Sequence, residues 1–390
     1  MGERTRQILP SVLSVLLALA VCWLTIALTR DADTATRAYL QMLWGGVGNW
    51  PAFLDGGNAN AVLRPLGEAA MKAAILTLTG LSVAVAFKVG LFNIGAQGQM
   101  IWGALAAALV GAHVSLPGVV HVPLALLAAA LAGATWSSIA AVLKLKRGVH
   151  EVISTIMLNW VAVSLVDNWL VIGPLRAVAE GQQSSITGTA EILATAQLPR
   201  LLGDSSRLNL GFPLALVAAL GVWVWLTRTR AGYETRAVGL TPEAARAAGI
   251  PTQTRAGGAM ALAGALAGLA GAVLVLGTEG RYPGSLGAPY GFDGIAIALI
   301  GNNHPLGAAV SAAVFGILRA GGTRMQLLGV HKSFPELIQG FALLFVAGRM
   351  VWLAVLRRRR EQPTREQPSG EQPSGEQPSG EQPVAEVPRA

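Results

Sequence analysis

Long apolar stretches alternate with short polar ones along most of the chain, a pattern typical of membrane-spanning helices. About 20 apolar residues suffice to cross the hydrocarbon core of a bilayer. We expect ten such spans, at 8–28, 67–87, 92–112, 119–142, 150–172, 210–227, 256–277, 288–301, 305–321 and 336–356. The span at 288–301 is short and is followed at once by GNNHPLG, so it predicts half of a broken or re-entrant pair. If that pair does not cross, the count falls to eight or nine.

The pattern predicts an all-α, polytopic transmembrane helical bundle of about eight to ten helices. Residues 1–65 hold the first helix and an extracytoplasmic segment, and residues 66–356 form the main transmembrane domain, with a cytoplasmic loop at 228–255. Residues 357–390 are a basic stop followed by EQPSG repeats without apolar residues to bury, so we expect a disordered C-terminal tail. The tail is either simply solvated or binds a partner.

Composition and charge support a membrane protein and give its orientation. Only 13% of the residues are charged and 53% are hydrophobic, whereas a soluble protein carries about 25% charged residues. The basic residues gather at the ends of apolar segments, notably at 144–147, 228–255 and 357–360. The positive-inside bias then puts both termini in the cytoplasm and the loops at 29–66 and 173–209 outside. A retained first helix is favoured over a cleaved signal peptide, because its apolar run is about 21 residues long.

Several kinds of active site are absent from the sequence. There is no GxxxxGK[ST] phosphate loop, no HExxH zinc pair and no GxSxG elbow. The single cysteine, Cys22, lies inside the first apolar run and has no metal-ligand spacing around it. We therefore expect no cofactor, no metal site and no ATPase or other catalytic site in this chain.

The first polar cluster lies in GLFNIGAQGQM, which begins the third predicted span. Asn93, Gln97 and Gln99 are amides at the start of an apolar helix, where an unpartnered amide is costly. They either bond to neighbouring backbone or line a path for a polar solute.

The second polar cluster lies in GVHEVISTIMLNW. Glu151, Ser154, Thr155 and Asn159 are three or four positions apart and form one stripe along a helix. A polar stripe at membrane depth faces other helices or a water-filled path. It is either interhelical glue or the lining for a polar substrate.

The third polar cluster runs from Thr278 to Gly307 and is rich in glycine and proline. It is either an ordinary external loop or irregular backbone lining a cavity at membrane depth. On the second interpretation Asn302 and Asn303, in the GNNHPLG turn, join the substrate path.

The cytoplasmic loop at 228–255 contains TPEAARAAGIP. Thr241 fits an N-cap, Pro242 and Glu243 suit a first turn, and Gly249 suits a C-terminal end, so we expect a short helix over Pro242–Ala248. Two helical turns are not stable alone. A partner protein is a natural docking surface for this helix.

EAARAAG at 243–249 resembles the EAA-x-x-x-G loop of bacterial ABC importer permeases. This resemblance covers Glu243, Ala244, Ala245 and Gly249 and implies that the loop docks into a cytoplasmic ATPase. FNIGAQGQM resembles the N-I-G-x-E/Q-G-Q signature of the branched-chain permease superfamily. GVHEVISTIMLNW and the GFDGIAIALIG region are similar to its nucleoside and simple-sugar branch, although the final motif here is NNHPLG. The four motifs occur in the family's order over about residues 66–350.

The resemblance implies a transport subunit in a bacterial plasma membrane. Its partners would be a separate ABC ATPase subunit, a second permease subunit, most simply as a heterodimer, and an extracytoplasmic substrate-binding lipoprotein. The neutral polar stripes suit a nucleoside or a simple sugar, and no feature indicates nucleic acid. The alternative is a stand-alone secondary transporter or channel, for which Glu151, Asp167, Glu279 and Asp293 are candidate ion-coupling carboxylates near span ends.

Overall fold

Helices make up the regular structure of the described part of the chain. The computed structural model describes residues 3–177, 188–286, 289–331 and 333–360, and within them the only β pairing is two isolated bridges. This confirms the predicted all-α class. The helices are α1 (Glu3–Thr29), α2 (Ala32–Val47), α3 (Trp50–Leu54), α4 (Asn60–Lys88), α5 (Ala96–His113), α6 (Gly118–Arg147), α7 (Glu151–Ala162), η1 (Val163–Leu170), η2 (Ala194–Ala196), η3 (Gly203–Ser205), α8 (Gly211–Arg228), α9 (Arg230–Leu240), α10 (Pro242–Ala247), α11 (Thr252–Leu274), η4 (Val275–Glu279), α12 (Tyr290–Ile300), α13 (Pro305–Met325), η5 (Gln326–Leu328) and α14 (Phe334–Arg360).

Each of the ten predicted spans falls on a helix. Among the described residues, seven helices are long and apolar enough to cross a membrane: Ser11–Thr29, Asn60–Lys88, Gly118–Arg147, Glu151–Leu170, Gly211–Arg228, Thr252–Glu279 and Pro305–Leu328. The other three predicted spans correspond to α5, α12 and α14. With 11 residues, α12 is about 16 Å long, roughly half the thickness of the hydrocarbon core. It turns directly into α13, as expected for a broken pair.

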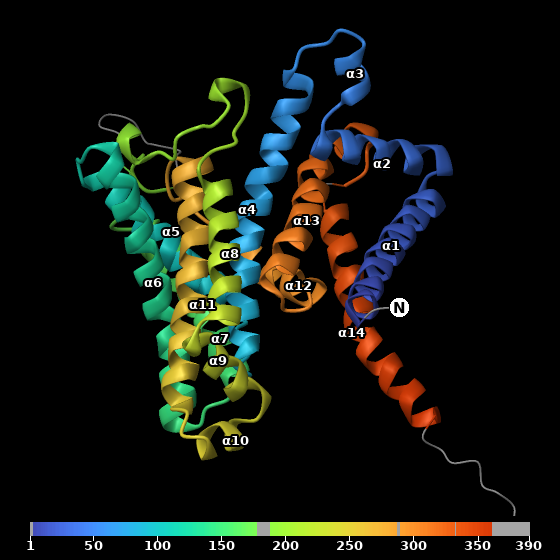
Figure 1. The fold of residues 1–390 in the computed structure, drawn as a ribbon. Helices are drawn as coiled ribbons and strands as arrows, with labels where there is room; N and C mark the ends of the chain where they lie inside the picture. The colour runs from blue at the N-terminus through green and yellow to red at the C-terminus, as the bar shows by residue number, and fades with distance from the viewer. Residues whose placement is uncertain (1–2, 178–187, 287–288, 332, 361–390) are drawn as a thin grey trace, which may run out of the picture. The chain divides into compact units, whose positions relative to one another are not determined.

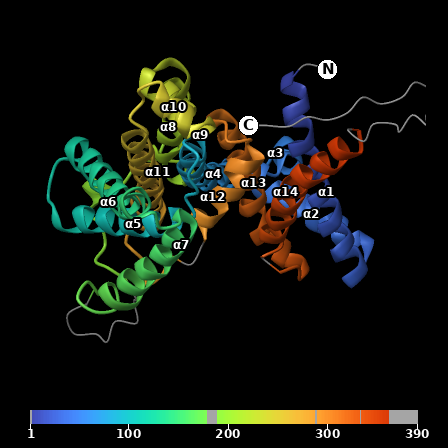
Figure 2. The same ribbon diagram turned by 90° about the horizontal axis from the view of Figure 1, so that it is seen from below.

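Residues 1–349 form one unit, and within it the buried side chains fall into two main apolar clusters. One cluster is built by α4 to α11, and the other mainly by α1, α2 and α12 to α14. Helix α4 contributes to both and lies between them (Figures 1 and 2). The two most buried spans are therefore α4 and α11, which hold the surrounding helices in place.

Glycines set how closely α11 approaches its neighbours. A Cβ atom on Gly268 would lie 2.2 Å from the carbonyl oxygen of Ala129 on α6, and one on Gly271 would lie 2.3 Å from that of Met100 on α5. Both distances are far below van der Waals contact. The small residues of α11 therefore allow the close helix packing that membrane bundles use.

The segment 29–66, expected as an external loop, contains two helices. Asp31 caps α2, since its side chain accepts from the backbone nitrogen of Thr34 at 2.7 Å. One face of α2 is buried, and Gly46 lies so close to α13 that a Cβ atom would sit 2.4 Å from the carbonyl oxygen of Ile317. The buried positions of α2 are mostly alanine and glycine, and Asp33 and Arg37 are exposed, so hydropathy did not identify the run as a helix.

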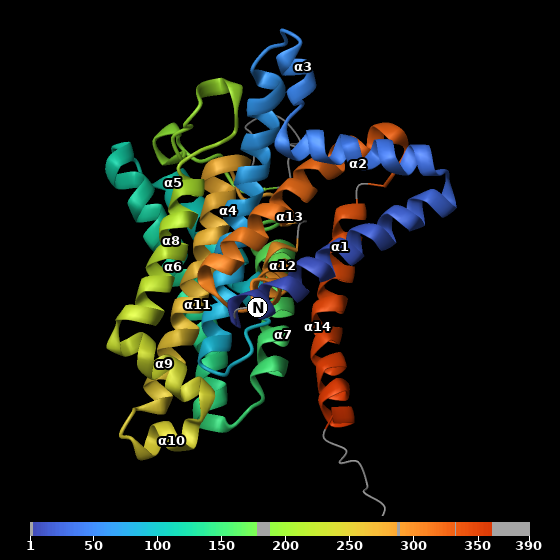
Figure 3. The ribbon, with the colours of Figure 1, turned by 45° about the vertical axis from the view of Figure 1, so that its right-hand side comes forward.

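The two ends of the bundle carry different elements. Helices α2 and α3 lie at one end, and α9 and α10 lie at the other (Figures 1 and 3). The predicted disordered tail lies outside the described residues from position 361 onward.

Candidate functional site

The amides at the start of α5 bond to each other. Asn93 donates to the Oε1 of Gln99 at 2.9 Å, and the Nε2 of Gln99 donates back to the Oδ1 of Asn93 at 2.8 Å. Asn93 also donates to the hydroxyl of Ser82 on α4 and accepts from the backbone nitrogen of Gly95. Both amides are almost fully buried. This pair closes the loop between α4 and α5 and leaves little amide surface for a solute.

Gln97 and Asn159 join the start of α5 to two other helices. The Oε1 of Gln97 accepts from the backbone nitrogen of Gly291 on α12 at 2.7 Å. Asn159 on α7 accepts from the backbone nitrogen of Gly98 and donates to the carbonyl of Ile94, both at 2.8 Å. The first turn of a helix has backbone N–H groups without intrahelical partners. Asn159 satisfies one of them for α5.

The remaining members of the second cluster bond locally. Ser154 and Thr155 donate to the carbonyl of Glu151, one turn earlier, at 3.1 and 2.7 Å. The Glu151 carboxylate lies 2.9 Å from the Nζ of Lys144 near the end of α6. All three side chains are buried, so this part of the stripe fastens the corner between α6 and α7.

Asn302 and Asn303 form the turn between α12 and α13. Both have a left-handed backbone, with φ of 56° and 52°, a conformation that asparagine tolerates better than most residues. Asn302 is exposed, whereas the Oδ1 of Asn303 is buried without a hydrogen-bond partner. The next residue, His304, caps α13 by accepting from the backbone nitrogen of Gly307.

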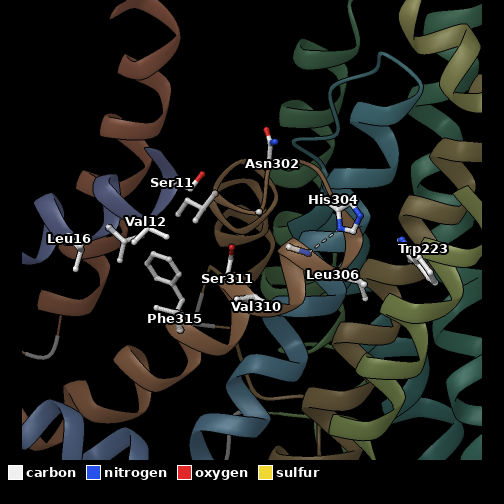
Figure 4. Close-up of a pocket in the computed structure, with 15 residues that line it drawn as sticks. Ser11, Val12, Leu16, Trp223, Asn302, His304, Leu306, Val310, Ser311 and Phe315 are labelled. Carbon is white, nitrogen blue, oxygen red and sulfur yellow. Dashed lines mark hydrogen bonds between the residues drawn. The ribbon is translucent and has the colours of Figure 1, made fainter. Parts of the chain in front are cut away.

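This turn borders a cavity of about 700 Å³. In Figure 4, Ser11 and Val12 of α1 lie on one side of the turn, and Trp223 of α8 lies on the other. Most of the lining is apolar, and its polar side chains are Ser11, Asn302, His304 and Ser311. Of the predicted path residues, Asn302 is the one that lines this cavity.

Asp293, a candidate ion-coupling carboxylate in the sequence, forms a buried ion pair at α12 that the sequence did not predict. Arg319 on α13 lies 2.7 Å from the Asp293 carboxylate, and its guanidinium stacks 4.9 Å from the centre of the Tyr290 ring. Gln339 on α14 donates to Asp293 at 2.8 Å. The group therefore ties the first turn of α12 to both α13 and α14. Its signal in the sequence is Arg319, a charged residue inside an apolar helix.

A second buried contact joins the loop after α11 to the end of α7. The hydroxyl of Tyr282, which is fully buried, donates to the carboxylate of Asp167 in η1. The backbone of Tyr282 also bonds to Thr189. Tyr282, within the third cluster, is therefore packed against protein.

The loop at 228–255 is braced from within. Glu234 on α9 lies 2.7 Å from the Nε of Arg230 and 2.5 Å from the Nε of Arg255, near the start of α11. The bonds from Arg230 and Arg255 lower the pKa of the Glu234 carboxyl. Because Glu234 is buried and shared between both arginines, α9 and α11 are fixed relative to each other.

Helix α10 lies between these braced helices and is mostly exposed. It covers Pro242–Ala247, one residue shorter than predicted, and Ala245 is its single buried residue. Thr241 occupies the N-cap position, but its side chain makes no capping bond, which corrects the prediction for that residue. Gly249 has φ of +77° and lets Ile250 turn back to bond the carbonyl of Ala245.

Metal binding finds no support in the described part of the chain. No group of three or more His, Cys, Asp or Glu side chains is placed to hold an ion there.

Comparison with known proteins gives a consistent set of relatives. The family model described as branched-chain amino acid transport system, permease component, matches residues 66–347. A guanosine ABC transporter permease protein of Bacillus subtilis is 38% identical over 72% of this chain and 80% of its own length. A glucose ABC transporter permease protein of Haloferax volcanii is 37% identical over 72% and 75%. A nucleoside ABC transporter permease protein of Lactococcus lactis is 32% identical over 74% and 80%.

No solved structure matches the chain. The family match covers most of the transmembrane domain, includes every site residue predicted from the sequence and agrees with the helical membrane fold. The chain belongs to the family of branched-chain amino acid transport system permease components and is a multi-pass membrane permease of the ABC transporter class.

Proposed function

We propose that this chain forms the translocation path of an importer for a nucleoside or a simple sugar, driven by a separate cytoplasmic ATPase subunit. The observation that carries the proposal is α10, a short helix that presents Glu243, Ala244 and neighbouring side chains to solvent. A helix of six residues is not stable without support. Here α9 and α11 supply that support, so the exposed side is available to a partner.

The mechanism is alternating access. Closure of the ATPase pair on ATP pushes on α10, and the Glu234 brace passes the displacement to α9 and α11 together. Helix α11 packs through glycines on α5 and α6, so its movement carries both helices. The buried amides Asn93, Gln97, Gln99 and Asn159 then keep α5, α7 and α12 in register around the path while they move.

The proposed partners follow from the same assembly. A second permease subunit, most simply as a heterodimer, completes the path, and an extracytoplasmic binding lipoprotein delivers the solute. The relatives bear the names of guanosine, nucleoside and glucose transporters, which supports a neutral solute rich in hydroxyl and amide groups. Asn302, exposed at the cavity, is the side chain best placed to contact it.

The secondary-transporter alternative is less well supported. Such a protein needs an embedded carboxylate able to take up an ion. Three of the four candidates are already bonded: Glu151 to Lys144, Asp167 to Tyr282 and Asp293 to Arg319. The fourth, Glu279, is exposed at the end of η4.

Co-purification in mild detergent, followed by ATPase assays with nucleosides and sugars, tests the proposal. We expect an ATPase and a second permease to accompany the chain, and Glu243→Arg or Gly249→Asp to release the ATPase. Asp33→Arg is the matched control, because Asp33 belongs to an exposed ion pair on α2 and such pairs contribute little. A chain that purifies alone and moves solute in liposomes without ATP would contradict the proposal.

A further inference from the structure

Helix α3 carries an apolar cluster that the rest of the chain does not cover. None of its five residues is buried, and Trp50, Phe53 and Leu54 are 45%, 37% and 77% exposed. The rings of Trp50 and Phe53 meet edge to face with centroids 6.1 Å apart. We call these three side chains the α3 tip. An exposed apolar group that is held in a fixed arrangement is characteristic of a contact site.

The α3 tip is fixed to the start of α4. The backbone nitrogen of Asn49 donates to the carbonyl of Ala61 at 3.1 Å, and its side chain caps α3 through the backbone nitrogen of Ala52. Figures 1 and 3 show α3 beside the first turns of α4, at the end of the bundle opposite α10. Its distance from the membrane is therefore set by α4.

The length of α4 places the α3 tip beyond the hydrocarbon. Its 29 residues span about 43 Å, against about 30 Å for a hydrocarbon core. Lys88 is the last residue at the end near α10, so the excess of about 13 Å lies at the end near α3. A tilt of about 20° shortens the projected helix by only a few ångströms.

Charges on α4 support this placement. Glu68 lies 3.2 Å from Arg207 of the segment before α8, and both side chains are at least one-third exposed. An ion pair of this exposure belongs in water or among lipid headgroups. Asn60, at the start of α4, is two turns farther out than Glu68, and α3 stands beside that start. We therefore expect the α3 tip to lie beyond the lipid chains, where a soluble protein can reach it.

We propose that the α3 tip is a docking contact for the soluble substrate-binding protein of the importer. This inference rests on the proposed function, which puts α3 on the outer side. Three side chains form too small a surface for a stable permease dimer, since obligate interfaces bury 2,000 Å² or more. A protein that docks and leaves in every cycle needs only a small contact, and a rigid aromatic pair beside a leucine suits an apolar recess on such a partner.

Labelling of a Leu54→Cys variant tests the docking directly. The native Cys22 is buried in α1, so it gives little background. In the assembled importer in nanodiscs, we expect a membrane-impermeant maleimide to react with the new thiol. Addition of the binding protein, defined by its stimulation of ATP hydrolysis by this importer, should slow the reaction about tenfold. A thiol that does not react in the free importer would show coverage by lipid or by the second subunit and would overturn the proposal.

Leu54→Asp gives the matching functional test. We expect the concentration of binding protein that half-saturates ATPase stimulation to rise about tenfold, because the variant loses one apolar anchor. The control is Leu327→Asp in η5, because Leu327 is 80% exposed and lies next to α2. Equal effects of the two variants, or no protection of Leu54→Cys, would overturn the docking proposal. If no binding protein stimulates the wild-type importer, the proposed function itself fails, whatever the variants do.

Discussion

The Oδ1 of Asn159 accepts a hydrogen bond from the backbone nitrogen of Gly98 at 2.8 Å, across the contact between α7 and α5. The same side chain donates to the carbonyl of Ile94. One amide therefore holds both the loop before α5 and the first turn of α5 against α7. Water does not replace such bonds in a bilayer, which makes each of them hard to lose. Asn159 therefore acts in the assembly of the bundle.

Asn159→Ala should lower stability by about 1–3 kcal/mol, the cost of leaving a buried backbone donor unsatisfied. Thermal unfolding in detergent measures this change. The control is Met157→Ala on the same helix, where the side chain is 55% exposed. If Asn159 instead contacts the solute, uptake would fall while the melting temperature stayed at the wild-type value.

The sequence predicts most helices of this fold, and for a clear physical reason. A bilayer demands long apolar runs, so α4, α6, α8, α11 and α13 are apparent from hydropathy alone. The short helix α10 was predicted as well, because proline and glycine mark its two ends. Helix α2 was missed because its buried face consists mostly of alanine and glycine packed on α13.

The candidate site could be predicted only in part. Amides such as Asn93 and Gln99 are conspicuous in an apolar run, but nothing in the run shows that they bond to each other. Their pairing depends on a turn between the loop and α5 that brings together two side chains six positions apart. Likewise, the partner of Asp293 is 26 positions away on another helix, and only the packing of α12 against α13 brings Arg319 to it.

The brace at Glu234 should be essential for coupling. Glu234→Gln keeps the size of the side chain but removes its charge, so we expect solute-stimulated ATPase activity to fall severalfold. The control is Glu191→Gln, which alters an ion pair with Arg281 whose glutamate is 71% exposed. Equal activity of the two variants would show that the brace does not transmit force.

The pH dependence of this brace has a defined sign. Its arginine partners hold the pKa of Glu234 below the ordinary value of 4.5. The ion pairs are therefore complete above that value and are lost only as the pH falls through the lowered pKa. We expect the titration of Glu234 to leave the solute-stimulated ATPase activity of the wild type unchanged between neutral and mildly acidic pH. Glu234→Gln should be impaired over the same range. Recovery of Glu234→Gln activity at any neutral pH would contradict this assignment.

Gly268 should not tolerate even one additional carbon. In Gly268→Ala the new Cβ would lie 2.2 Å from the carbonyl oxygen of Ala129, so α11 and α6 must separate. Overpacking of this kind costs about 1–3 kcal/mol. Gly258→Ala on the same helix is the control, because a Cβ there meets no atom within 4 Å. Alanine should stabilise that position by up to about 1 kcal/mol, and equal melting temperatures for the two variants would refute the packing argument.

Replacing only Arg319 of the ion pair with Asp293 should destabilise the protein more than replacing both residues. The two side chains are 12% and 8% exposed. Arg319→Met leaves a buried carboxylate without its partner and should destabilise the protein by about 3–5 kcal/mol. Adding Asp293→Asn removes the stranded charge and still offers an oxygen to Gln339, so the double variant should recover most of that loss. Thermal unfolding of both single variants and the double variant measures the coupling, and strictly additive losses would show that the two charges act independently.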